Sequence, residues 1–155
     1  MNIIIGADHA GFTLKEKFAL WLKKKGHKIT DISNKTRDVN DDYPDISQQV
    51  AQKVAKTKSK GILICGTGIG VCIVANKIRG IRAVAAPTPL FAKLSRQDED
   101  TNILCLAGAD TKKHVPGLHH SITQAKAIVH IWLTTRFSNA TRHIRRINEI
   151  KKLEQ

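Results

Sequence analysis

Aromatic and acidic residues are scarce in this chain. Of its 155 residues only 5% are aromatic, and 13 acidic residues stand against 26 lysines and arginines, which gives a formal net charge of +13. Few aromatic rings leave few surfaces on which unpaired bases can stack, so nucleic acid is not the expected partner despite the charge. The positive excess does attract phosphate groups of any kind, and charge alone does not say which.

Cysteines and long hydrophobic runs are also few. The chain has three cysteines and no Cys-x-x-Cys pair, so we expect no disulfide framework and a reducing, cytoplasmic compartment. No apolar stretch approaches the roughly 20 residues of a membrane span, and no basic segment precedes the apolar N-terminus, so we expect neither a membrane anchor nor export. The apolar fraction of 41% is sufficient for one core, and we expect a single domain over residues 1–155.

Short apolar segments alternate with helical patterns along most of the chain. Strands are expected at 2–7, 27–32, 61–65, 81–86 and 102–107. Helices are expected from a Thr13/Glu16 capping box to Gly26, from Asp45, capped with Gln48, through Ala55, and at 71–78, 90–96, 121–134 and 141–153. This alternation indicates a doubly wound, Rossmann-like α/β fold with a five-stranded parallel sheet and helices on both faces. The last helix has no strand to follow it, and we expect it to pack on a second copy in a homodimer.

The segment 61–77, GILICGTGIGVCIVANK, places glycines at every second position after a buried strand. A dinucleotide-binding fingerprint needs its third glycine one residue later and an acidic residue about 20 positions on, where this chain reads AVAAPTP. A P-loop needs a Gly-Lys-Ser/Thr sequence that the segment lacks. Both kinds of nucleotide site are therefore excluded.

The glycine-rich turn is suited to an anion. Its glycines allow successive backbone amides to converge on one point, and the N-terminus of the following helix adds positive potential. Cys65 ends the preceding strand, where open α/β sheets bind ligands, and it can serve there as a base or be a small buried residue. Cys72 and Cys105 fall inside a helix and a strand, so we expect both to be buried hydrophobic residues.

Two other groups of residues suit a polar ligand. Asp8 and His9 directly follow the first strand, which places a carboxylate and an imidazole at the same edge of the sheet as Cys65, although His9 can equally be a turn residue. Arg142 and Arg146 lie four residues apart on one face of the last helix. That spacing suits either a phosphate or a solvated basic surface.

Several motifs occur in a fixed order: GADHAGF, DDYP at 41–44, GILICGTGIGVCIVANKIRGIRA, LSRQ followed by DTN, and RHIRR. In order and spacing they resemble the type B ribose-5-phosphate isomerases and their relatives, the isomerases of galactose and allose 6-phosphates. The resemblance covers nearly the whole chain. It implies aldose–ketose isomerisation of a sugar phosphate at a homodimer interface, without metal or organic cofactor.

The resemblance also implies roles for individual residues. Cys65 is the expected base, and the enediolate is expected to be stabilised by the Thr67 hydroxyl together with the backbone amides of Gly66, Gly68, Ile69 and Gly70. Asp8 and His9 are expected to contact the sugar or its phosphate. Tyr43 is expected to line the pocket, and Arg142 and Arg146 to bind the phosphate.

The sequence departs from this family in two places. Ribose-type members commonly read RQHNDTN, with a histidine that opens the sugar ring and an asparagine that binds substrate; this chain reads RQDEDTN, which places Asp98 and Glu99 in those roles. After the last strand the family commonly reads GSR, whereas this chain reads GAD followed by an apparent insertion within 107–120. Lys112 and Lys113 of that insertion can replace the lost arginine. Its histidines lack ligand spacing, so no metal site is expected there.

Three functions follow from these observations. The favoured one is interconversion of ribose 5-phosphate and ribulose 5-phosphate. A second is isomerisation of another sugar phosphate, such as a hexose 6-phosphate, either alone or as the cysteine-supplying subunit of a two-chain enzyme. The third is a non-catalytic relative that binds a phosphorylated ligand or nucleic acid.

Overall fold

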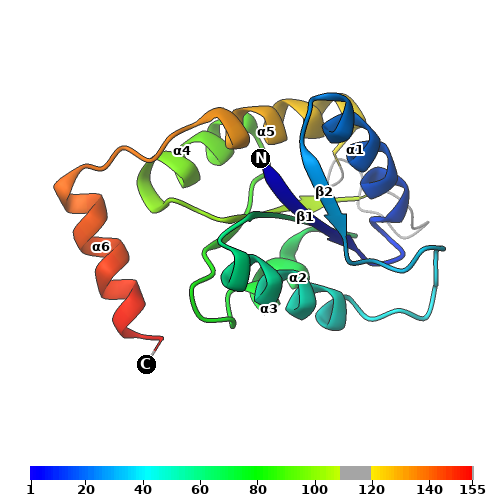
Figure 1. The fold of residues 1–155 in the computed structure, drawn as a ribbon, viewed down its shortest axis with the longest axis horizontal. Coiled ribbons are helices and arrows are strands. Elements are labelled where there is room, and N and C mark those ends of the chain that lie inside the picture. Colours follow the sequence, from blue (N-terminus) through cyan, green and yellow to red (C-terminus); the bar gives the residue numbers. More distant parts are fainter. Residues whose placement is uncertain (109–119, 155) are drawn as a thin grey trace.

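Five parallel strands form one sheet in the order β2-β1-β3-β5-β4 (Figure 1). The computed structural model describes residues 1–108 and 120–154. The strands are β1 (Asn2–Ala7), β2 (Lys28–Asp31), β3 (Lys60–Cys65), β4 (Ala83–Ala85) and β5 (Ile103–Ala107). The helices are α1 (Phe12–Lys24), α2 (Tyr43–Thr57), α3 (Ile69–Ala75), α4 (Pro89–Glu99), α5 (Ile122–Thr134) and α6 (Thr141–Lys152). The doubly wound α/β fold is confirmed.

Helices cover both faces of the sheet because its central strands are apolar on both sides. Side chains alternate along each strand, so Ile3 and Ile5 face one way and Ile4 faces the other. The first face packs against α1, α4 and α5, and the second packs against α2 and α3. Figure 1 shows these two groups of helices above and below the sheet.

The connections run in opposite directions from the middle of the sheet. From β1 the chain crosses to β2 on one side, and from β3 it crosses to β4 at the far edge on the other side. The carboxyl ends of β1 and β3 therefore lie at a topological switch point, where open α/β sheets bind their ligands.

The first helix begins earlier than the sequence predicts. Its N-cap is Gly11, with no side-chain cap, so the expected Thr13/Glu16 capping box is wrong. A Cβ on Gly11 would lie 2.5 Å from the carbonyl oxygen of Ile64. This close approach to β3 determines where the chain turns into α1. Gly26, with a φ of +81°, follows the end of the helix as expected.

Three other helices also differ at their ends. Helix α2 is capped at Asp42 with no side-chain cap bond, so the expected cap at Asp45 with Gln48 is wrong, and Pro44 lies in the first turn. Helix α3 runs from Ile69 to Ala75, whereas 71–78 is expected, and α4 extends three residues beyond the expected end at residue 96. The longer α4 places residues 98 and 99 in a helix.

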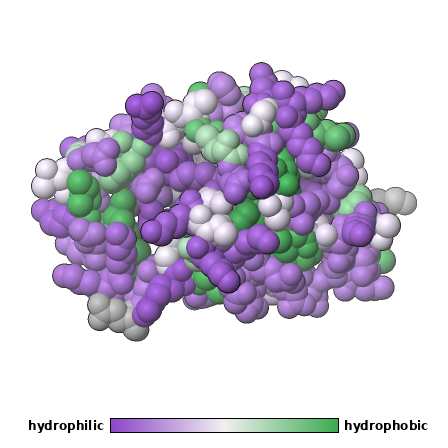
Figure 2. Space-filling view, in the orientation of Figure 1, coloured by the Kyte–Doolittle hydropathy of each residue, from purple (hydrophilic) through white to green (hydrophobic). Residues whose placement is uncertain are grey.

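Helix α6 stands apart from the other helices at one end of the molecule (Figure 1). Of its residues only His143 and Ile147 are buried. Hydrophobic side chains break the hydrophilic surface over this helix (Figure 2), and Ile144, Ile150 and the following Leu153 are exposed. None of the helices within 1–108 and 120–154 is both long and apolar enough to span a membrane.

Candidate active site

The switch point brings the Asp8–His9 pair and Cys65 to the same edge of the sheet. Asp8 is the first residue after β1, and its amide donates to the carbonyl of Ile64 at 3.3 Å. Cys65, the last residue of β3, follows Ile64 directly. The residues that the sequence assigns to the two strand ends are therefore neighbours in space.

The carboxylate of Asp8 is held rigidly by its own turn. Its Oδ1 accepts the amides of Ala10 at 3.0 Å and Gly11 at 3.1 Å, and the residue is only 6% exposed. Burial raises the pKa of Asp8, and the two amide hydrogen bonds oppose that rise. The site thus holds a carboxyl group in one orientation and makes its charged form costly.

The imidazole of His9 is paired with Asp41. Its Nδ1 lies 2.7 Å from Asp41 Oδ1, and the same oxygen accepts the backbone amide of His9 at 2.9 Å. The side chain of Asp41 is only 9% exposed, whereas that of His9 is 27% exposed. Arg37 Nε also donates to the carbonyl of His9 at 2.9 Å. These contacts place the Nδ1 proton on the side of Asp41 and leave Nε2 on the opposite side of the ring.

The glycine-rich turn folds back over the Cys65 thiol. The amide of Gly68 donates to Cys65 Sγ at 3.1 Å, and Gly68 has a φ of +75°, which favours glycine. The amide of Ile69 donates to the Thr67 hydroxyl at 3.2 Å. Cys65 is 5% exposed, and a donor in this position can stabilise negative charge on its sulfur.

The ring of Tyr43 lies against the same turn. A Cβ built on Gly70 would come within 2.7 Å of Tyr43 Cε2, so a larger residue at position 70 would displace the ring. Tyr43 is 40% exposed. The first residue of α2 thus forms part of the rim beside the glycine-rich turn.

A pocket of about 210 Å³ opens on the other side of this turn. Thr67, Ile69, Cys105 and His120 contribute to its wall. His120 Nδ1 accepts the amide of Ala107 at 3.3 Å, and its Nε2 lies 3.3 Å from the carbonyl of Pro87. The ring therefore ties the end of β5 to the segment after β4.

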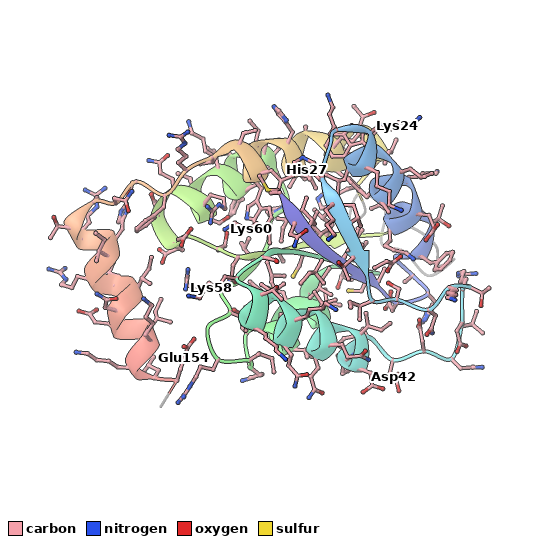
Figure 3. The ribbon with its side chains drawn as sticks, in the orientation of Figure 1. Lys24, His27, Asp42, Lys58, Lys60 and Glu154 are labelled. Carbon is pink, nitrogen blue, oxygen red and sulfur yellow. The ribbon has the colours of Figure 1, made fainter. Side chains whose placement is uncertain are left out.

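Asp98 and Glu99 lie at the opposite end of the sheet, beside the amino ends of its strands. They end α4, which runs back from the carboxyl end of β4 to the amino end of β5. Asp98 Oδ1 is 3.6 Å from Nδ1 of His143 on α6, and the carbonyl of Glu99 accepts Arg82 Nε at 2.7 Å. Figure 3 labels a residue near each edge, Asp42 beside the carboxyl ends and Lys60 at the amino end of β3. Within a single chain, neither Asp98 nor Glu99 lies beside Cys65.

Arg142 and Arg146 belong to the same distant group. Both are exposed on α6, four residues apart. Arg142 Nε donates to Nε2 of the buried His143 at 3.0 Å, and Nδ1 of that ring lies 2.8 Å from the Ser138 hydroxyl. The two arginines thus lie with Asp98 near the amino ends of the strands. They are not beside the glycine-rich turn of their own chain.

Residues 3–150 match the family model described as Ribose/Galactose Isomerase. The chain belongs to this ribose/galactose isomerase family. It is 40% identical to the ribose-5-phosphate isomerase B of Escherichia coli strain K12, over 99% of this chain and 97% of that protein. It is 39% identical to the probable ribose-5-phosphate isomerase B of Mycoplasma genitalium, over 99% of this chain and 96% of that protein.

Solved structures of ribose/galactose isomerases have the same fold. The ribose-5-phosphate isomerase B of Clostridium thermocellum superposes with a TM-score of 0.88 at 37% identity, covering 99% of this chain and 97% of that one. The Mycoplasma genitalium enzyme with bound ribulose-5-phosphate gives a TM-score of 0.88 at 39% identity, covering 99% and 95% of the two chains.

Two residues of the candidate site are not identified by the sequence. Asp41 lies within the DDYP motif, but nothing local indicates that its partner is His9, 32 residues earlier. In the sequence His120 belongs to the apparent insertion within 107–120, and its place on the pocket wall depends on its contacts with the end of β5. Lys112, Lys113, His114 and His119 lie outside the described residues.

Proposed function

We propose that the chain is a ribose-5-phosphate isomerase that interconverts ribose 5-phosphate and ribulose 5-phosphate. The observation that carries this proposal is the position of Cys65, at the end of β3, under a turn whose Gly68 amide points at its sulfur. The bound ribulose-5-phosphate of the Mycoplasma genitalium relative supports a pentose phosphate as the substrate.

In this proposal Cys65 is the base. It takes the proton from C2 of the open-chain aldose, and the electron pair of that bond forms the C1=C2 double bond while negative charge moves to O1. The hydroxyl proton on O2 then passes to O1, and Cys65 returns the first proton to C1. The product is the ketose, with its carbonyl at C2.

The glycine-rich turn stabilises the enediolate. Because the Gly68 amide is engaged with Cys65 and the Ile69 amide with Thr67, we assign the anion to the amides of Gly66 and Gly70 and to the Thr67 hydroxyl. Preorganised donors of this kind are typically worth about 3–4 kcal/mol each in the transition state. These groups supply base and anion stabilisation without a metal ion or organic cofactor.

Asp8, His9 and Tyr43 form the rest of the rim and hold the sugar or its phosphate. Asp41 fixes His9 through one hydrogen bond to its imidazole and one to its backbone amide, which reduces the entropy lost when a ligand binds. We assign the +13 net charge to attraction of phosphorylated substrates and not to nucleic acid.

A second copy completes the site. Asp98, Glu99, Arg142 and Arg146 lie at the opposite edge of their own sheet, so they reach a Cys65 only on another chain. The exposed apolar residues of α6 support a homodimer in which this helix packs on its partner. There the two arginines bind the phosphate and Asp98 is the acid for ring opening.

The proposal is tested by assaying Cys65→Ala with ribose 5-phosphate. Loss of a general base typically lowers kcat by about 10²–10⁴-fold, and we expect a loss in this range with an unchanged circular dichroism spectrum. Cys72→Ala under reducing conditions is the matched control, because it removes a neighbouring thiol outside the proposed machinery. Undiminished turnover of Cys65→Ala would refute the base assignment, and a preference for hexose 6-phosphates would change the substrate.

A further inference from the structure

The three cysteines of the chain gather on one face of the sheet. Strands β3 and β5 pair with Leu63 opposite Cys105 and Cys65 opposite Ala107, so Cys65 and Cys105 are diagonal neighbours whose side chains share a face. Both belong to the core that packs against α2 and α3, and Cys72 of α3 packs onto the same core. Cys105 is 1% exposed, as the sequence predicts, but Cys72 is only half-buried.

The side chains of Cys72 on α3 and Cys105 on β5 interact within this core. The side-chain amide of Asn76 lies 3.6 Å from Cys72 Sγ, and the same amide nitrogen donates to the carbonyl of Ala83 at 3.0 Å. The Asn76 side chain thus links the Cys72 thiol on α3 to β4.

The two thiols differ in their chemistry. The hydrogen bond with Cys105 lowers the pKa of Cys72, and the Ala85 and Asn76 amides add to this effect against the opposing effect of burial. Burial raises the pKa of Cys105 well above its ordinary value. Since the thiolate is the reactive form, Cys72 is the nucleophile of the pair and Cys105 is the protonated partner.

We propose that Cys72 and Cys105 form a reversible disulfide when the chain is exposed to hydrogen peroxide. The Cys72 thiolate attacks one peroxide oxygen, the O–O bond breaks, and the hydroxide that leaves takes up a proton to become water. The Cys105 sulfur then attacks the Cys72 sulfenic acid, giving up its own proton and expelling a second water. Two thiols are thereby oxidised by two electrons, and one peroxide is reduced.

The disulfide alters the glycine-rich turn. Formation of the bond requires a sulfur–sulfur distance of about 2.05 Å, which draws α3 toward β5. Helix α3 begins at Ile69, directly after the turn that covers Cys65, so the amides of the turn move with the helix. Isomerase activity falls as a result and returns on reduction; this consequence rests on the proposed function, whereas the disulfide itself does not.

The test oxidises the full chain with hydrogen peroxide and measures intact mass, disulfide-linked peptides and isomerase activity. Cys72→Ser is the variant, because residue 72 is half-buried and serine keeps its size and polarity. We expect wild type to lose two hydrogen atoms, to yield a peptide pair joining Cys72 to Cys105, and to lose activity that dithiothreitol restores. Cys72→Ser retains its mass and its activity at the same dose.

The remaining outcomes overturn the proposal. A cross-link from Cys65 to Cys105, no cross-link at all, or equal inactivation of wild type and Cys72→Ser would place the oxidation elsewhere. Wild-type chain with no isomerase activity before oxidation would refute the proposed function instead, while the mass and peptide measurements would still decide whether the disulfide forms.

Discussion

At the scale of single residues, the ionised carboxyl of Asp8 lowers the stability of the folded chain. Burial raises the pKa of this carboxyl, so over the affected pH range the folded chain binds more protons than the unfolded chain. Stability therefore falls as pH rises through that range. This loss of stability is present at neutral pH, and it disappears as pH drops below the pKa that Asp8 has in the unfolded chain.

Asp8→Asn removes this cost while leaving an amide oxygen to accept the Ala10 and Gly11 amides. We expect the free energy of unfolding at pH 7 to rise, by on the order of 1 kcal/mol, and the difference from wild type to shrink at pH 4. Urea unfolding at the two pH values measures this. A variant that is less stable than wild type at pH 7 would contradict the expectation. Isomerase activity falls at least about tenfold if the carboxylate contacts substrate.

Asp41 acts through His9. Asp41→Asn keeps the shape of the side chain but replaces charge-assisted hydrogen bonds by neutral ones, so we expect kcat/KM to fall about tenfold with little change in unfolding temperature. Asp38→Asn is the control, because it makes the same charge change on an exposed residue of the same loop. Equal effects of the two substitutions on kcat/KM would assign the loss to the charge of the loop and not to His9.

The carboxyl-edge residues of the site were predictable and their partners were not. Position at a strand end identifies Asp8, His9 and Cys65, because parallel strands share one edge. The pairing of His9 with Asp41 depends on where the long loop before α2 crosses β1. That path is a property of the packed chain and has no periodic signal in the sequence.

At the scale of elements, α2 and the glycine-rich turn depend on each other through Tyr43 and Gly70. Gly70→Ala displaces the Tyr43 ring, since the added Cβ would lie 2.7 Å from it. We expect KM to rise in Gly70→Ala and in Gly70→Ala/Tyr43→Phe, which keeps the ring. In a Tyr43→Ala background the same substitution has no further effect, because the clash is gone.

A double-mutant cycle on kcat/KM measures this coupling, which is typically 0.5–3 kcal/mol for residues in contact. Additive effects of Gly70→Ala and Tyr43→Ala would mean that the methyl group disturbs the turn directly and that the Tyr43 ring does not transmit the effect.

The types and order of the elements followed from sequence, and several of their ends did not. Apolar runs such as 61–65 identify the strands because both faces of the sheet are buried. Helix α1 starts at Phe12 because Gly11 must pass close to Ile64, and that contact is absent from any local pattern. The extra residues of α4 move Asp98 and Glu99 to the end of a helix that points away from Cys65.

At the scale of the whole molecule, the proposed site combines the carboxyl end of the sheet of one chain with residues at the amino end of the sheet of its partner. A mixture of Cys65→Ala with Arg142→Ala/Arg146→Ala therefore regains activity, since a mixed dimer contains one intact site. With random exchange of subunits the recovered activity is about a quarter of wild type. Co-expression of the two variants with different tags, followed by the isomerase assay, measures it.

Cys65→Ala mixed with Asp8→Asn is the matched control. Both changes lie at the carboxyl edge of the same chain, so no arrangement of the mixed dimer restores an intact site. Recovery in this control, or full activity of Arg142→Ala/Arg146→Ala on its own, would contradict a site shared between copies.

The position of α4 has a consequence for how the protein behaves in dilute solution. Because this helix carries Asp98 and Glu99 to the far edge of the sheet, the proposed site exists only in the assembled pair, and a separated chain holds two unmatched halves. Specific activity then becomes a function of protein concentration, constant while the pairs persist and declining once dilution separates them. Catalytic activity per chain would therefore depend on how much of the protein is present.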